Sequence, residues 1–113
     1  MPRDCKIDYV EFPAQVLGMT TSFYSRVFGW RFTDYGNNYS AFDEGVEGGF
    51  QGDPKERKDK PLVVIYAQDL EAVEAKVRAS GGQVIKPIFP FPGGRRFHFL
   101  DPSGNELAVW SDR

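Results

Sequence analysis

The chain has little of several residue types that would indicate a particular compartment or chemistry. Cys5 is the only cysteine among 113 residues, so no intramolecular disulfide can form, which is typical of a reducing compartment. The formal net charge is −2, and no basic excess is available for nucleic acid or for an anionic membrane surface. The longest apolar run, residues 62–67, is far too short to span a membrane. We therefore expect a cytoplasmic protein without a secretory signal, without a nucleic-acid partner and without a membrane partner.

What the chain does contain is enough apolar material for one core. Hydrophobic residues make up 41% of the sequence and aromatic residues 15%, with ten phenylalanines. The length matches a single domain of ordinary size, residues 1–113. So many rings in a small protein favour a cavity or an interface lined by aromatic side chains.

Periodicity predicts the same order of elements twice, β-α-β-β-β followed by β-α-β-β-β. The first module, about residues 6–52, is expected to hold strands at 7–12, 30–34, 39–43 and 46–51. Its helix carries Val16, Met19, Phe23 and Val27 at spacings of three and four, and Gly29 ends it. A charged, non-periodic stretch at 53–60 reads as a linker.

The second module, about residues 61–111, is expected to hold strands at 62–67, 83–88, 95–100 and 106–110. Its helix begins after Asp69, a favourable N-cap, and Gly81-Gly82 closes it. Leu70, Val73 and Val77 form its apolar stripe. Residues 89–94 read as a proline-stiffened loop, and its Phe89 and Phe91 fit either a lid or a packing and dimer contact.

The two modules also share sequence. Residues 14–17 match residues 67–70 at three positions of four, and Gly29 falls on Gly82 at the same offset. The matches lie at helix starts and stops, so we predict an α+β fold made of two related modules. A single ferredoxin-like module with additions is the structural alternative.

Three stretches resemble the glyoxalase/bleomycin-resistance/dioxygenase (vicinal oxygen chelate) superfamily. They are Phe23–Trp30, similar to the family's FYxxxFGW; Ala67–Leu70 leading to Gly81-Gly82; and Phe99–Leu107, similar to its FxDPxGNxL hairpin. The resemblance implies paired βαβββ modules whose curved sheets form a cup, usually completed in a homodimer. It also implies that a small molecule is bound or transformed inside that cup.

Family members often hold a divalent metal with one side chain from each of four cup-lining strands. The matching positions here are Tyr9, about Phe50, Leu62 and Ala108. Leucine, alanine and phenylalanine have no donor atom, and a neutral tyrosine is a poor ligand. We therefore predict no cofactor and no metal at these positions, which removes the simplest basis for a glyoxalase I or a ring-cleaving dioxygenase.

Strand alternation, aligned on those positions, predicts which side chains line the cup. The expected ligand-binding residues are Tyr9, Phe50, Tyr66, Arg96, Glu106 and Trp110. Glu11 and His98, the only histidine, are the candidate catalytic residues, because a carboxylate in an apolar site and an imidazole can each move a proton near neutral pH. Apolar walls with a few placed polar groups are typical of a ligand pocket. Residues 101–105 read instead as turn chemistry.

Three classes of function remain open from the sequence. The first is a metal-free binding or sequestering protein of the drug-resistance type. The second is a lyase or isomerase that uses Glu11 and His98 without a metal. The third is a metal enzyme with shifted ligands, for instance Glu11, Glu47, His98 and Glu106.

Overall fold

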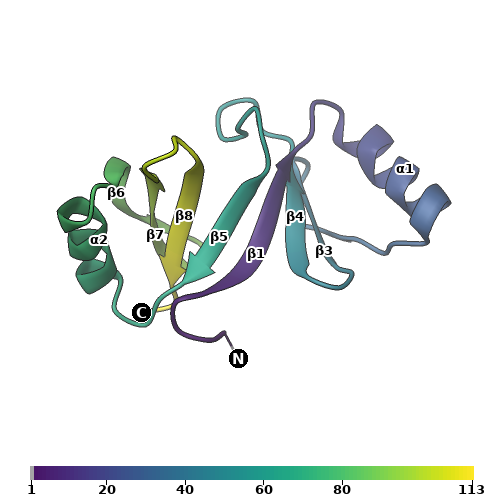
Figure 1. Cartoon of the computed structure of the whole chain (residues 1–113). Coiled ribbons are helices and arrows are strands. Elements are labelled where there is room, and N and C mark those ends of the chain that lie inside the picture. The colour runs from purple at the N-terminus through teal and green to yellow at the C-terminus, as the bar shows by residue number, and fades with distance from the viewer. Residues whose placement is uncertain (1) are drawn as a thin grey trace. The chain divides into compact units, whose positions relative to one another are not determined.

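The computed structural model describes residues 2–113, and over that range it is an α+β structure with two helices and eight strands (Figure 1). In chain order the elements are β1 (Lys6–Pro13), α1 (Leu17–Phe28), β2 (Thr33–Asp34), β3 (Tyr39–Asp43), β4 (Glu47–Gln51), β5 (Leu62–Tyr66), α2 (Leu70–Ala79), β6 (Gln83–Phe91), β7 (Gly94–Leu100) and β8 (Glu106–Ser111). The predicted β-α-β-β-β repeat is therefore confirmed. Within residues 2–113, neither helix has the length and apolar character that crossing a membrane requires.

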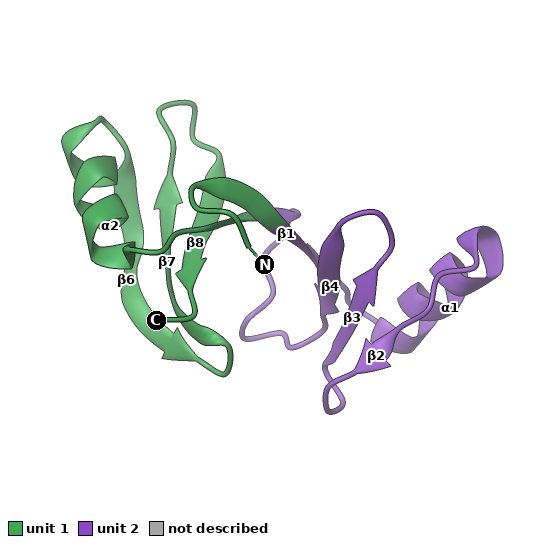
Figure 2. Ribbon diagram, turned by 90° about the horizontal axis from the view of Figure 1, so that it is seen from below, with its two compact units in different colours: residues 1–8, 63–113 green, residues 9–62 purple. Residues whose placement is uncertain are grey.

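The chain forms two compact units, coloured separately in Figure 2. One comprises Tyr9–Leu62, and the other comprises the residues up to Asp8 together with Val63–Arg113. The N-terminal segment is tied to the second unit by hydrogen bonds from the Cys5 amide to the Tyr66 carbonyl and from the Gln68 amide to the Asp4 carboxylate, both 2.8 Å long.

In the 9–62 unit the strand order is β2-β3-β4-β1. Strands β1 and β4 run parallel, whereas β3 is antiparallel to both β4 and β2. The core beside α1 is aromatic; its buried members are Ala14, Phe42 and Phe50, with Phe12, Leu17, Tyr24, Trp30 and Phe32 packed against them. The expected strand at 30–34 is reduced to Thr33–Asp34, because Trp30 and Phe32 turn into this core rather than extending a ladder.

Helix α1 has a well-formed C-terminal end but no side-chain cap at its N-terminal end. Gly29 takes the left-handed conformation (φ 71°) and its amide bonds the Ser25 carbonyl, so the predicted stop is confirmed. At the start, Val16 occupies the N-cap position and no side chain caps the first turn. The helix face predicted from Val16, Met19, Phe23 and Val27 is exposed: Met19 is 72% exposed, Val16 56%, Val27 54% and Phe23 47%.

In the second unit the strand order is β5-β8-β7-β6, with β5 and β8 parallel and the other two pairs antiparallel. Helix α2 covers one face of this sheet (Figure 1). The Asp69 carboxylate caps it by accepting a hydrogen bond from the Ala72 amide at 3.1 Å, as predicted. The core on that face is made by Ala67, Leu70, Phe97 and Val109, with Ile65, Val73, Val77, Val84, Ile88 and Phe99 around them.

The prediction of a loop at residues 89–94 is wrong for residues 89–91, which belong to a strand. Strand β6 continues through Phe91 and pairs with β7, with irregular register after Val84 and after Lys86. Pro87 and Pro90 are tolerated because β6 is the edge strand of its sheet, where a missing amide donor breaks no ladder bond on the open side. Phe89 and Phe91 are therefore strand residues rather than loop residues.

Candidate functional site

The strongest candidate site is the face of the β5-β8-β7-β6 sheet that lies opposite α2. Because Ile65, Phe97 and Val109 pack toward α2, alternation turns their neighbours to the other face. Cross-strand pairing then aligns two rows on that face, one of Tyr66, Trp110, Arg96 and Phe89, and one of Val64, Ala108, His98 and Lys86. We call this surface the platform; its members are Val64, Tyr66, Lys86, Phe89, Phe91, Arg96, His98, Glu106, Ala108 and Trp110.

His98 is the best-fixed polar group of the platform. Its side chain is 2% exposed, and its Nδ1 lies 2.9 Å from Glu106 Oε2. A carboxylate can only accept a hydrogen bond, so Nδ1 carries the proton and the lone pair of a neutral ring lies on Nε2. The Phe89 ring lies 5.8 Å from the imidazole, centroid to centroid. The arrangement is a carboxylate-oriented imidazole beside an aromatic wall.

Arg96 lies close to two aromatic rings. Its Cζ is 5.4 Å from the centre of Phe89 and 5.2 Å from the centre of Phe91. Lys86 approaches Phe89 as well, with Nζ 4.1 Å from the ring centre. Contacts of a cation with a ring face within about 6 Å are attractive, so these rings hold two positive groups at the β6–β7 side of the platform.

At the β5–β8 side the platform is acidic. The Trp110 indole donates to Asp8 at 2.8 Å, and the Tyr66 hydroxyl donates to Asp112 at 2.6 Å. The bond to Asp112 raises the pKa of the Tyr66 phenol, with burial adding to the effect. Tyr66 and Trp110 contact each other edge to face at 5.2 Å, which fixes both rings.

The 9–62 unit has its own polar group on the sheet face opposite α1. The hydroxyls of Tyr9 and Tyr39 are 2.5 Å apart, and Glu11 pairs with Gly49 in the neighbouring strand. A Cβ atom on Gly49 would lie 2.3 Å from the Tyr39 hydroxyl, so only glycine leaves room for that ring. Burial raises the pKa of Tyr9, and the Tyr39 hydrogen bond lowers it to a smaller extent. Tyr9 therefore stays protonated and acts as a hydrogen-bond donor or acceptor, not as a base.

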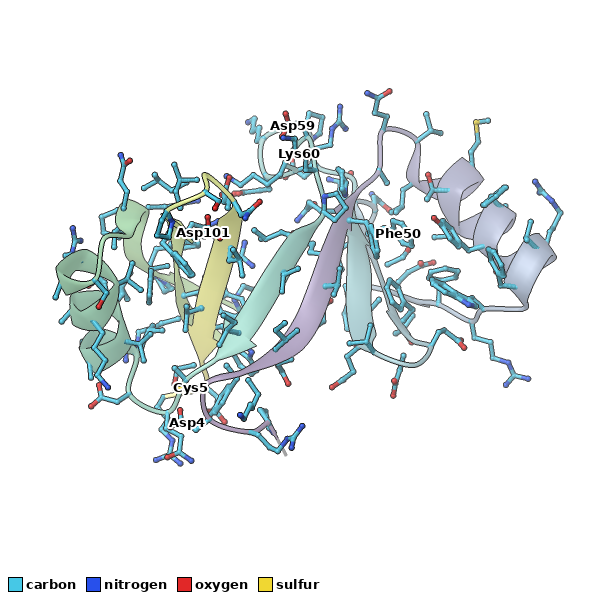
Figure 3. All side chains as sticks on the ribbon, viewed as in Figure 1. Asp4, Cys5, Phe50, Asp59, Lys60 and Asp101 are labelled. Carbon is cyan, nitrogen blue, oxygen red and sulfur yellow. The ribbon has the colours of Figure 1, made fainter. Side chains whose placement is uncertain are left out.

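Phe50 does not lie where the sequence placed it. It is 2% exposed and stacks on Phe12 at 5.3 Å, on the side of β4 that faces α1 (Figure 3). The register of β1 with β4 puts Gly49 next to Glu11, so glycine occupies the neighbouring position on the opposite face. The expected placement of Phe50 on the cup-lining face is therefore wrong, because its ring belongs to the aromatic core beside α1.

The residues at the superfamily's metal positions do not suit a divalent ion. Leu62 and Ala108 are buried and have no donor atoms, and the hydroxyl of Tyr9 is engaged with that of Tyr39. Phe50 belongs to the core. Within residues 2–113, no group of three or more His, Cys, Asp or Glu side chains could hold a metal ion.

The hairpin at 101–105 is held by Asp101, labelled in Figure 3. Its carboxylate accepts from the amides of Ser103 and Asn105 and from the Asn105 side chain, at 2.8–2.9 Å. These bonds, the Asn105 side chain first, lower the pKa of Asp101. The carboxylate serves the turn, which agrees with the turn chemistry expected from the sequence.

A separate pocket of about 430 Å³ opens beside α1 in the 9–62 unit. Its lining is polar, and it comprises Thr21, Ser22, Ser25, Arg26, Phe32 and Asp34. None of the residues expected from the sequence to bind a ligand lines this pocket.

Of the predicted site residues, five are brought together on the platform: Tyr66, Arg96, His98, Glu106 and Trp110. Tyr9 and Glu11 belong to the other unit. Sequence reasoning did not assign Lys86, Phe89 or Phe91 to this surface. The alternation of Phe89 and Phe91 with other residues is typical of a strand, but the prolines among them indicated a loop instead.

The fold and the platform define a small α+β protein of two βαβββ modules with a polar and aromatic sheet face. The family model described as the Glyoxalase/Bleomycin resistance protein/Dioxygenase superfamily matches residues 6–109. The chain therefore belongs to this superfamily, as the three sequence stretches indicated. No curated protein matches the sequence.

Solved structures share the fold at low sequence identity. A Mn(II)-bound glyoxalase from Novosphingobium aromaticivorans is 24% identical with a TM-score of 0.69; the match covers 99% of this chain but 40% of that one. A methylmalonyl-CoA epimerase from Mycobacterium tuberculosis is 13% identical with a TM-score of 0.70, covering 93% and 86%. The hypothetical protein BH1468 from Bacillus halodurans C-125 is 12% identical with a TM-score of 0.76, covering 98% and 96%.

Proposed function

We propose that this chain binds a small, partly apolar organic molecule on the platform, and that it does so without the superfamily's usual metal. The observation that carries the proposal is the His98–Glu106 pair, a nearly buried imidazole fixed at 2.9 Å by a carboxylate and flanked by the Phe89 ring. Apolar walls with a few oriented polar groups are the common composition of small-molecule sites.

A metal-independent lyase or isomerase is the second candidate, favoured by the same pair. Glu106 holds the proton on Nδ1, so Nε2 of His98 is the atom that would take a proton from a substrate and return it. The carboxylate would also stabilise the imidazolium formed in that step. Glu11, the other acid–base residue expected from the sequence, belongs to the other unit.

We include in the proposal that binding needs no metal, because the side chains at the superfamily's metal positions lack suitable donor atoms. Leucine and alanine stand at two of the four superfamily positions, and neither can bind an ion. The metal enzyme with shifted ligands Glu11, Glu47, His98 and Glu106 has no support within residues 2–113, where no such group of side chains could hold an ion. A stoichiometric divalent ion found by elemental analysis of the purified protein would refute the metal-free proposal.

The test is an amide and indole NMR titration of the full chain with a panel of small aromatic and aliphatic compounds, with and without chelator. We expect shifts at the Trp110 indole and none at that of Trp30, unchanged by chelator. Glu106→Gln should weaken binding by about tenfold, because a charged hydrogen bond that orients His98 is lost.

Glu71→Gln is the matched control, since Glu71 lies on α2 at the opposite face and pairs with Arg95. Binding that resists Glu106→Gln, or that shifts only residues outside the platform, would refute the proposed site. Loss of binding on chelation would refute its metal-free character. Turnover of any bound compound that disappears in His98→Gln would favour the enzyme.

A further inference from the structure

The pocket of about 430 Å³ beside α1 is a second concave feature, and none of the platform residues lines it. We call it the α1 pocket. Its volume lies within the range of about 300–1,000 Å³ that is typical of small-molecule sites. Every residue of its lining belongs to the 9–62 unit, so the pocket is complete within that unit.

The hydroxyl groups of Thr21 and Ser25 offer acceptors to this pocket rather than donors. The Ser25 hydroxyl donates its one proton to the Trp30 carbonyl at 2.9 Å, and the Thr21 hydroxyl donates to the Gly18 carbonyl at 3.3 Å. Each hydroxyl oxygen keeps lone pairs, which can only accept. Thr21 and Ser25 are four residues apart on α1 and therefore lie on the same helix face. The lining thus suits a ligand that brings N–H donors.

Asp34, on β2, adds a charged acceptor to the same lining. Its Oδ1 accepts a hydrogen bond from the Ser40 hydroxyl, and Ser40 is only 1% exposed, so the carboxylate is held from the buried side. A carboxylate has two oxygens and can accept further hydrogen bonds. An ammonium group has three donors and no acceptor, so it matches the oxygens of Thr21, Ser25 and Asp34.

Arg26 brings the opposite charge to the α1 pocket. Arg26 and Asp34 both line it and both are exposed, yet within residues 2–113 no ion pair joins them. Two opposite charges that share a pocket without neutralising each other can pair with the two charges of a zwitterion. A guanidinium recognises a carboxylate through paired N–H donors. The half-buried ring of Phe32 supplies an apolar contact in the same lining.

We propose that the α1 pocket binds a free α-amino acid with an apolar side chain, in its zwitterionic form. Its ammonium group lies on Asp34, with the oxygens of Thr21 and Ser25 as further acceptors. Its carboxylate lies on Arg26, and its side chain lies against Phe32. The inference goes beyond the function proposed for the platform and does not depend on it.

The test compares L-leucine with two blocked forms, N-acetyl-L-leucine and L-leucinamide, by amide NMR titration of the full chain. At about pH 6 the α-ammonium group is protonated and the carboxylate is ionised. We expect L-leucine to shift the amides of Ser25, Arg26 and Asp34 and to leave the Trp110 indole unchanged. It should bind about fivefold more tightly than either blocked form, the upper end for one exposed charge pair.

Two variants remove the charges one at a time. Arg26→Gln should weaken L-leucine about fivefold and leave L-leucinamide unaffected, because that probe has no carboxylate. Asp34→Asn should weaken L-leucine by a similar factor and leave N-acetyl-L-leucine unaffected; its side-chain carbonyl can still accept from Ser40. Unchanged binding of the blocked probe shows in each case that the pocket remains folded.

Arg31→Gln and Asp43→Asn are the matched controls. Both residues are exposed in the same unit and lie outside the lining, and each variant makes the same change of charge. Both should bind L-leucine as the unmodified chain does. Equal binding of L-leucine and either blocked form, or no saturable shift at the α1 pocket, would overturn the inference. A preference that survives both Arg26→Gln and Asp34→Asn would overturn it as well.

Discussion

At the scale of single residues, the lack of a side chain at Gly49 makes room for the hydrogen-bonded pair Tyr9 and Tyr39. Gly49 is buried in β4, and the ring of Tyr39 occupies the space where its Cβ would be. That placement brings the Tyr39 hydroxyl to 2.5 Å from the hydroxyl of Tyr9 on the next strand but one. The two phenols share a hydrogen bond that neither strand could make if residue 49 carried a side chain.

The Tyr9 phenol should ionise at higher pH than an ordinary tyrosine. Burial raises its pKa above the usual 10.0, Glu11 and Glu47 add to the rise, and the Tyr39 hydroxyl opposes it. Because the folded-state pKa is the higher one, the neutral phenol contributes stability that is complete below pH 10 and is lost as the pH rises through the folded-state pKa. A ¹³Cζ-tyrosine NMR titration measures it.

In Tyr39→Phe the opposing hydrogen bond is gone, so the pKa of Tyr9 should rise further. Tyr35→Phe is the control, because that ring is 63% exposed and affects Tyr9 only through its charge. Ionisation of Tyr9 at or below the ordinary pKa would contradict the burial of this phenol.

At the scale of elements, the two helices differ in the capping and charged residues that stabilise their first turns. Helix α2 has Asp69 as its cap, Glu71 in the first turn and Lys76 and Arg78 in the last turn. Each of these groups complements the helix dipole or an unpaired amide. Helix α1 has no side-chain cap and no acid in its first turn, and none of its residues is fully buried. We infer that α1 is the less stable helix.

Replacing Val16 with aspartate should stabilise α1. Val16 is already in the extended conformation of an N-cap (φ −128°, ψ 95°) and is 56% exposed, so the change costs little packing. A capping carboxylate is worth about 1 kcal/mol, which for a domain of this size raises Tm by several degrees. Calorimetry measures the shift.

Gln15→Asp is the control, because residue 15 is exposed and lies one position before the cap. It adds the same charge without reaching the first-turn amides. An equal gain from both variants would mean that charge alone, not capping, stabilises the helix.

At the scale of the whole molecule, the exposed stripe of α1 bears on assembly. Met19, Phe23 and Val27 recur at helical spacing and are between 47% and 72% exposed. A continuous apolar row on a surface helix is the kind of patch that proteins cover by association. The family resemblance implies a homodimer, so we expect a second copy of this chain to cover the stripe.

Sedimentation velocity should then give about twice the monomer mass of 12.8 kDa. Phe23→Glu should return the protein to the monomer mass, since a charge in the centre of an apolar interface is costly. Val46→Glu, at a 42% exposed position outside α1, should leave the dimer intact. A wild-type monomer at high micromolar concentration would refute the dimer.

Much of the fold could be predicted from the sequence because the signals are local. Residues 39–43 were predicted as a strand with the observed ends, Gly29 ends α1, and Asp69 caps α2. For the platform, strand alternation together with the family resemblance assigned Tyr66, Arg96, His98 and Trp110 to one face, and the packing of Phe97 and Val109 on α2 agrees with that assignment.

Tertiary structure decided what local patterns leave ambiguous. Alternation within β4 is satisfied by either face, and only its register with β1 put Phe50 into the core and Gly49 beside Glu11. Likewise, Pro87 and Pro90 predict an interruption unless the strand is known to lie at a sheet edge, where β6 lies. The sequence by itself determined the elements and the faces within strands, because both depend on near neighbours. Whether a given strand face packs on a helix or meets solvent depends on residues distant in the chain. Only the folded structure decided this, because it alone brings those distant residues together.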